Sequence, residues 1–279
     1  MTTLADVLAN SGAPIGDRYD RPCRVPSHVH VCITGDGSVL LDLKRDKYFG
    51  LGREDTWLLA TMVDDWPCPA WTRTPAESPN PEAAKRICRS MLEEGLLVEE
   101  GTLASGRRAK EQNDTCETGG VSIAGRDRSS IDMKAPLLSV GDEIEVPAAI
   151  RFRHVARFVA AYAWASYSLR GRLLMATVTA IRVKKNQRLQ SGARWELLRL
   201  AGLIDIFRRL RPYLFAAEGH CMVHALTLVR FLGSYDIYPD WVIGVATQPW
   251  AAHSWVQWGN YLLDTNPEKV CQYTPILVV

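Results

Sequence analysis

A cysteine, a histidine and an aspartate near the end of the chain stand in an order that can support nucleophilic chemistry. Cys221 precedes a run of apolar residues at helical spacing, so we expect it at or near the start of a helix. At such a position the helix dipole and the unpaired amides stabilise a thiolate, and the same amides can bind an oxyanion. Cys221 is therefore the candidate nucleophile.

His253 and Asp264 are the candidate partners of this thiol. Two strand-like runs, 253–258 and 261–263, are joined by a Gly-Asn turn, which favours an antiparallel hairpin. Such a hairpin would bring His253 and Asp264 side by side on neighbouring strands. A carboxylate beside an imidazole fixes its tautomer and stabilises its charged form, which a cysteine–histidine pair needs. The pattern predicts His253 as the base and Asp264 as the acid that orients it.

Two other interpretations of these residues stay open. A free cysteine in an apolar helix is more often a core residue than a nucleophile, and we interpret the other six cysteines that way. His220 and His224 flank Cys221 at the spacing of the zinc-binding HExxH helix. A cysteine stands where that motif has its glutamate, and no third ligand is evident nearby, so we expect no metal. His224 is expected to pack or hydrogen-bond on the helix.

The composition is that of a folded chain with room for two domains. The 279 residues are 47% apolar and 23% charged, with a formal net charge of +2. No basic block of the kind that binds nucleic acid is present, so we expect no nucleic-acid partner. The chain opens without a signal-like segment and its seven cysteines are scattered, which predicts a cytoplasmic protein with reduced thiols. The longest apolar stretch, Phe158 to Leu169, is too short to span a bilayer.

The first hundred residues are expected to form one domain, 1–100. Short β-rich runs separated by turns occupy 28–52 and predict an antiparallel meander. Helical patterns follow at 53–63 and at 81–94, the second with a proline near its first turn and Gly95 at its end. This order of elements predicts a small α+β, winged-helix-like module.

The remainder divides into a linker and a second domain. Residues 101–147 contain no Phe, Trp or Tyr, and so little apolar surface cannot offset the entropy of ordering. Apolar and aromatic residues return in helical patterns through about Phe215, before the helix and strands that carry the candidate site. We therefore predict a linker at 101–147 and a second α+β domain at 148–279.

The C-terminal motifs resemble those of the lasso-peptide B proteins, the leader peptidases of lasso-peptide biosynthesis. The resemblance is carried by CMVHALTLVRFLG, Ile243-Gly244-Val245, Ala252-His253-Ser254-Trp255-Val256-Gln257 and Leu263-Asp264. It implies a papain- or transglutaminase-like cysteine protease domain whose catalytic residues are Cys221, His253 and Asp264. Family members commonly end the last strand with Asn-Asp, which would set the acid one residue later, where this chain has Thr265.

Residues 1–100 resemble the small PqqD-like elements that recognise leader peptides. The likeness rests on the run Val39 to Leu43 and on the segment Asp46 to Leu51. It implies that a leader binds as an added strand on a sheet edge, against a neighbouring helix. The residues expected to contact the leader are Leu41, Leu43, Tyr48, Phe49, Ile87 and Met91.

Together the two resemblances imply a lasso-peptide maturation protease. It would bind the leader of a ribosomal precursor peptide, cleave leader from core, and supply the core to an asparagine-synthetase-like lasso cyclase. ATP would belong to that cyclase, because this chain has no GxxxxGK[ST] loop, and no cofactor is implied here. Membrane association would arise through a complex rather than through this chain. Two alternatives stay open: acyl transfer to an amine by the same triad, as in transglutaminases or arylamine acetyltransferases, and a non-catalytic peptide-delivery scaffold.

Overall fold

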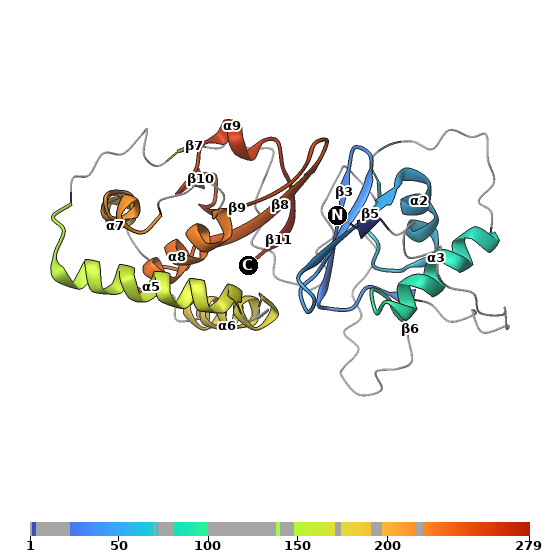
Figure 1. Cartoon of the computed structure of the whole chain (residues 1–279), viewed down its shortest axis with the longest axis horizontal. Helices are drawn as coiled ribbons and strands as arrows, with labels where there is room; N and C mark the ends of the chain where they lie inside the picture. Colours follow the sequence, from blue (N-terminus) through green and yellow to red (C-terminus); the bar gives the residue numbers. More distant parts are fainter. Residues whose placement is uncertain are drawn as a thin grey trace. The chain divides into compact units, whose positions relative to one another are not determined.

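The computed structural model describes residues 2–3, 23–69, 71, 81–99, 138–139, 148–170, 174–190, 197–215 and 220–279. Contacts divide the chain into two compact units, Met1–Arg126 and Asp127–Val279 (Figure 1). Both units combine helices with mostly antiparallel strands, which confirms the prediction of mixed α and β structure. The predicted boundaries 1–100, 101–147 and 148–279 stay a prediction. The predicted linker lies outside the described residues except for two that form a strand.

An antiparallel meander forms the sheet of the first unit. Its strands are β3 (Val29–Thr34), β4 (Gly37–Asp42) and β5 (Lys47–Gly52), and β1 (Thr2–Thr3) pairs in parallel with β5. The sheet order is β1-β5-β4-β3. The turn into β4 requires glycine, because Gly37 has φ 149° and a Cβ there would lie 1.9 Å from the Leu51 carbonyl oxygen. The meander predicted for 28–52 is confirmed.

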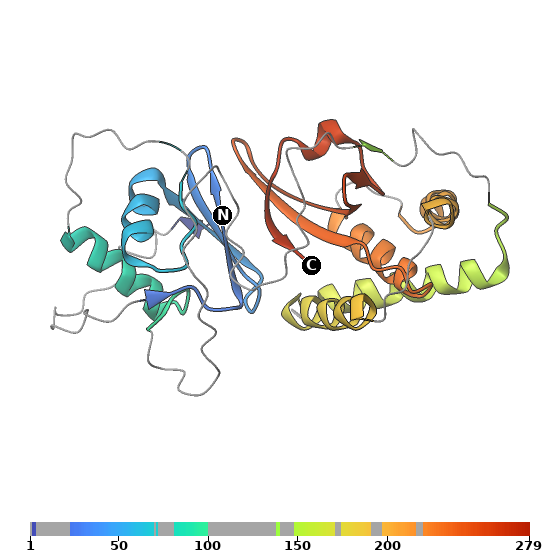
Figure 2. The same cartoon turned by 180° about the vertical axis from the view of Figure 1, so that it is seen from behind.

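Two helices cover one face of this meander (Figures 1 and 2). α2 (Arg53–Met62) and α3 (Pro81–Glu93) are each one residue shorter than predicted. Gly95, at φ 67°, follows α3 in the left-handed conformation that commonly ends a helix. Leu59 of α2 and Met91 of α3 pack on Leu40 of the sheet in one apolar core. A short pair, β2 (Cys23–Arg24) with β6 (Val98–Glu99), completes the described part of the unit.

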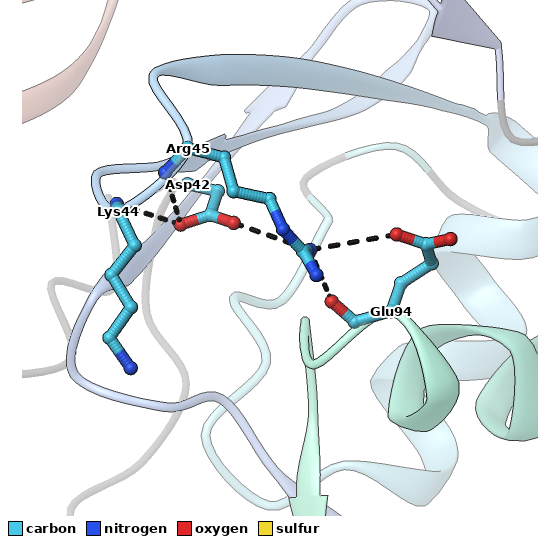
Figure 3. A network of polar contacts seen from close by, with 4 residues as sticks. All are labelled: Asp42, Lys44, Arg45 and Glu94. Carbon is cyan, nitrogen blue, oxygen red and sulfur yellow. Dashed lines mark hydrogen bonds and ion pairs between the residues drawn. The ribbon is translucent and has the colours of Figure 1, made fainter. Parts of the chain in front are cut away.

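A polar network holds the turn between β4 and β5 against the end of α3 (Figure 3). The buried Asp42 carboxylate accepts hydrogen bonds from the backbone N–H groups of Lys44 (2.9 Å) and Arg45 (3.4 Å). The Arg45 guanidinium contacts Asp42 and also reaches the carbonyl oxygen and carboxylate of Glu94. A cation at the C-terminal end of a helix is favoured by the helix dipole, so Arg45 ties the meander to α3.

Five of the six residues expected to contact a leader peptide are buried in the first unit. Phe49, Ile87 and Met91 are 4%, 5% and 0% exposed and belong to the core between the sheet and the helices. The other three are Leu41 and Leu43, which are buried, and Tyr48, which is partly exposed. In this conformation the three core residues stabilise the fold. Contact of the six with a leader peptide stays a prediction.

The second unit stacks helices on a sheet. α5 (Phe152–Arg170) packs on α8 (Cys221–Gly233), and α8 packs on a strand of the sheet (Figure 1). α6 (Leu174–Gln190), α7 (Leu197–Leu210) and the 3-10 turn Arg211–Tyr213 confirm the helical patterns predicted up to residue 215. Phe158 of α5 contacts Phe207 of α7 and Phe231 of α8 through ring edges. Within the described ranges, every helix is too short or too polar to cross a bilayer.

The sheet of the second unit has the order β11-β8-β9-β10-β7. Its strands are β7 (Leu138–Ser139), β8 (Asp240–Thr247), β9 (Trp250–Trp258), β10 (Tyr261–Leu262) and β11 (Thr274–Val278), with the short helix α9 (Pro267–Val270) before β11. The strands predicted at 253–258 and 261–263 are confirmed, although β9 begins three residues earlier. β7 lies within the predicted linker, and β11 was not predicted.

Candidate active site

Cys221 is the first residue of α8, as predicted. His220 is the N-cap, with φ −98° and ψ 38°, and its side chain does not cap the helix. The amides of the first turn consequently lack partners within the helix. The cysteine is partly exposed, whereas most of α8 from His224 onward is buried. This position combines solvent access with the local positive potential that a nucleophilic thiol needs.

His253 belongs to a row of side chains along one face of β9. The alternation of a strand places His253, Trp255 and Gln257 on that face. The imidazole stacks on the Trp255 ring, with centroids 6.1 Å apart and planes at 22°, and lies 5.2 Å from the ring of Tyr273. The Trp255 indole N–H donates to Gln257 Oε1 (2.7 Å), and the Gln257 amide donates to the carbonyl of Gly259 (3.1 Å). These contacts hold the histidine ring in place.

Gly244 of β8 leaves space for this row. It is the cross-strand partner of His253. A Cβ at this position would lie 2.7 Å from the Trp255 ring and 2.9 Å from Tyr273 Cβ. The Ile-Gly-Val and His-Ser-Trp-Val segments are therefore complementary in shape: the glycine of one accommodates the indole of the other.

The pKa of His253 is lowered from its ordinary value. Burial is the largest cause, and the positive charges of Lys269 and His224 act in the same direction, while Asp264 raises the pKa. His253 Nε2 is buried and has no hydrogen-bond partner among the described residues. The site favours the neutral imidazole, which is the form that can accept a proton from a thiol.

Asp264 lies two residues past the end of β10, and its side chain is only 4% exposed. Its Oδ1 accepts a hydrogen bond from the Val256 backbone N–H (3.0 Å), and its Oδ2 is 3.3 Å from His224 Nδ1. Its charge acts on His253, but no hydrogen bond joins those two side chains in the described part of the chain. The role of Asp264 as the acid that orients His253 stays a prediction.

The partner of His224 was not foreseen from the sequence. We expected His224 to pack or hydrogen-bond on its helix, but it pairs with a carboxylate from the far side of the hairpin. The signal in the sequence is its position three residues after Cys221, which places both on the same side of α8. Where the structure is described, no group of three or more His, Cys, Asp or Glu side chains could hold a metal ion.

Comparison with known proteins finds this part of the chain similar to a known family. Residues 163–278, which include Cys221, His253 and Asp264, match the family model of the transglutaminase-like superfamily. These residues form a transglutaminase-like domain. The domain contains α8 and the hairpin β8–β9, the two elements that carry the candidate nucleophile and base.

One curated relative is similar to part of the chain. The microcin J25-processing protein McjB of Escherichia coli is 35% identical over 86 residues, a match that covers 30% of this chain and 39% of that protein. The chain therefore aligns with well under half of the relative's length. No solved structure is significantly similar to the chain.

Proposed function

We propose that this chain is a lasso-peptide maturation protein whose transglutaminase-like domain cleaves a precursor peptide between leader and core. The observation that carries the proposal is the partly exposed Cys221 at the start of α8, in the same domain as the buried His253, whose lowered pKa favours its neutral form. The partial similarity to a microcin J25-processing protein supports a role in peptide maturation.

The proposed reaction begins with transfer of the Cys221 thiol proton to His253. The thiolate attacks the carbonyl carbon at the leader–core junction, and the first amides of α8 stabilise the oxyanion. His253 then protonates the leaving amine of the core, which leaves the leader as a thioester on Cys221. Water, deprotonated by His253, hydrolyses the thioester and frees the cysteine. The charge of Asp264 stabilises the imidazolium between these steps.

We propose the first unit as the module that recognises the leader. β1 and β3 are the outer strands of its described sheet, and an extended peptide can add to an outer strand through backbone hydrogen bonds. The released core, with its new amine, is the expected substrate of an asparagine-synthetase-like, ATP-dependent lasso cyclase, which would join that amine to an acidic side chain. The cyclase is thus the expected protein partner.

The test is to incubate the purified chain with the precursor encoded beside its gene, with and without the cyclase, and to record intact masses. Wild type and Cys271→Ala, which changes an exposed cysteine of the same unit, should give separate leader and core. Cys221→Ala should lose at least about 10³-fold in rate, and His253→Ala a similar amount. A precursor that binds but stays intact in every combination would favour the scaffold without catalysis.

Acyl transfer to an amine is a second candidate, because the superfamily match is to transglutaminase-like proteins. The same thioester would then be attacked by a primary amine instead of water. Adding a primary amine to the reaction and weighing the leader product separates the two functions. A leader with a free carboxylate supports hydrolysis, and a leader carrying the amine supports transfer.

A further inference from the structure

We propose that His224 is a positioning residue of the active site: it holds Asp264 in place and so ties the nucleophile's helix to the strand that carries the base. The inference rests on the proposed function, because it takes Cys221 and His253 as the reacting groups. His224 itself need not touch the substrate.

The pair is buried at both ends. The side chains of His224 and Asp264 are 11% and 4% exposed, and His224 Nδ1 lies 3.3 Å from Asp264 Oδ2. A buried carboxylate is costly unless its oxygens are hydrogen-bonded. The backbone N–H of Val256 donates a hydrogen bond to Oδ1, and the His224 imidazole lies within ion-pair distance of Oδ2. Loss of the imidazole would therefore leave one carboxylate oxygen without its protein partner.

The surrounding rings fix the orientation of His224. Its centroid lies 5.4 Å from that of Phe207 and 5.2 Å from that of Phe215. Turning the imidazole away from Asp264 would require these rings to move. Its Nε2 is buried without a hydrogen-bond partner in the described residues, which carries a cost that an apolar side chain would not have. The favourable polar contact of His224 is the one that Nδ1 makes.

Asp264 joins the two elements that bear the proposed chemistry. His224 lies three residues after Cys221 on α8, and Val256 lies three residues after His253 on β9. Because one carboxylate contacts both elements, we infer that the spacing of nucleophile and base depends on it. A displacement of about 1 Å in such an arrangement can cost about a hundredfold in rate.

The experiment uses the full chain with His224→Leu, His224→Gln, Asp264→Ala and the double variant His224→Leu/Asp264→Ala. His154→Gln, at another buried histidine of the same unit, is the matched control. The first measurement is kcat and KM for cleavage of the precursor. The second is the rate at which iodoacetamide alkylates Cys221 at about pH 7, followed by peptide mass, which needs no precursor.

We expect His224→Leu and Asp264→Ala each to lower kcat by about 10- to 100-fold with little change in KM. Since both break one connection, the double variant should be within about threefold of the slower single variant. His224→Gln keeps an N–H donor that can face Asp264 and should lie within about fivefold of wild type. Alkylation of Cys221 should slow in the same order, and His154→Gln should match wild type in both measurements.

The proposal is overturned if His224→Leu has the kcat and the Cys221 alkylation rate of wild type. It is also overturned if the loss of kcat in the double variant equals the product of the losses in the two single variants. If His224→Leu fails to fold, His224→Gln decides: a loss as large as that of Asp264→Ala would reject the polar contact with Asp264 as the role of His224. If the wild-type chain cleaves no precursor, the proposed function fails, and alkylation alone tests the pair. Equal slowing in His224→Leu and Asp264→Ala then supports it, and unchanged alkylation rejects it.

Discussion

His253 shows how single residues set the chemistry of the site. Trp255 and Tyr273 enclose its ring, and that burial outweighs the opposing charge of Asp264. Asp264 favours the charged form of His253, but burial of the ring keeps the imidazole neutral before the reaction begins. This combination suits a base that becomes charged only during the reaction.

The lowered pKa of His253 predicts a pH-dependent stability. Since the unfolded pKa is about 6.5, the unfolded chain binds more protons than the folded protein between that pH and the lower folded pKa. The stability from the neutral form is complete above about pH 6.5 and is lost as pH falls through the folded pKa. We expect the free energy of unfolding in urea to be lower at about pH 5.5 than at about pH 7.5, and His253→Gln to reduce that difference.

Two other histidines provide the background for this measurement. The pKa values of His28 and His154 are also lowered, mainly by burial, so part of the fall should remain in His253→Gln. A fall in stability as large in the variant as in wild type would show that His253 does not contribute.

At the scale of elements, the hairpin β8–β9 positions the base through shape as well as hydrogen bonds. Trp255 occupies the space that Gly244 leaves on the neighbouring strand, and His253 stacks on the same indole. The position of the histidine ring therefore depends on a residue with no side chain of its own.

Gly244→Ala should destabilise the chain by about 1–3 kcal/mol, because the added methyl group meets the Trp255 ring at 2.7 Å. It should also slow precursor cleavage, since the indole supports His253. Gly35→Ala is the control: a Cβ there has no atom within 4 Å, and the change should stay within about 0.5 kcal/mol. Urea unfolding of both variants checks this, and equal stabilities would mean that the strand relaxes around the methyl group.

At the scale of the whole molecule, we propose that the two units carry out separate parts of the reaction. The family match covers residues 163–278, which lie entirely in the unit Asp127–Val279. The described part of the other unit has its own sheet, the helices α2 and α3, and an apolar core. Leader capture by one unit and cleavage by the other would then depend on the covalent connection between them.

We expect the intact chain to cleave precursor faster than an equimolar mixture of fragments 1–126 and 127–279. A short tether gives an effective concentration near the millimolar range, so at about 1 µM the intact chain should be faster by on the order of 10²-fold. The advantage should shrink as the fragment concentration rises. Cleavage rates over a concentration series measure it, and equal rates at low concentration would rule out capture by the tethered unit.

Local patterns in the sequence were sufficient to predict most elements of the described chain. The meander at 28–52, the helices α2 and α3, and the start of α8 at Cys221 depend on alternation, helical spacing and turn residues among near neighbours. For the same reason the positions of Cys221 and His253 on a helix start and a strand were predictable. Their catalytic roles remain proposals.

Only the tertiary structure decided the contacts between residues far apart in the chain. β11 pairs with β8 across the intervening hairpin, and Phe49, Ile87 and Met91 turn inward to form a core. Asp264 pairs with His224 because packing brings α8 against β9, whereas the sequence shows only that a carboxylate follows a short turn. A buried polar group bonds whichever partner the packed elements bring within reach, and that choice is not encoded in local spacing.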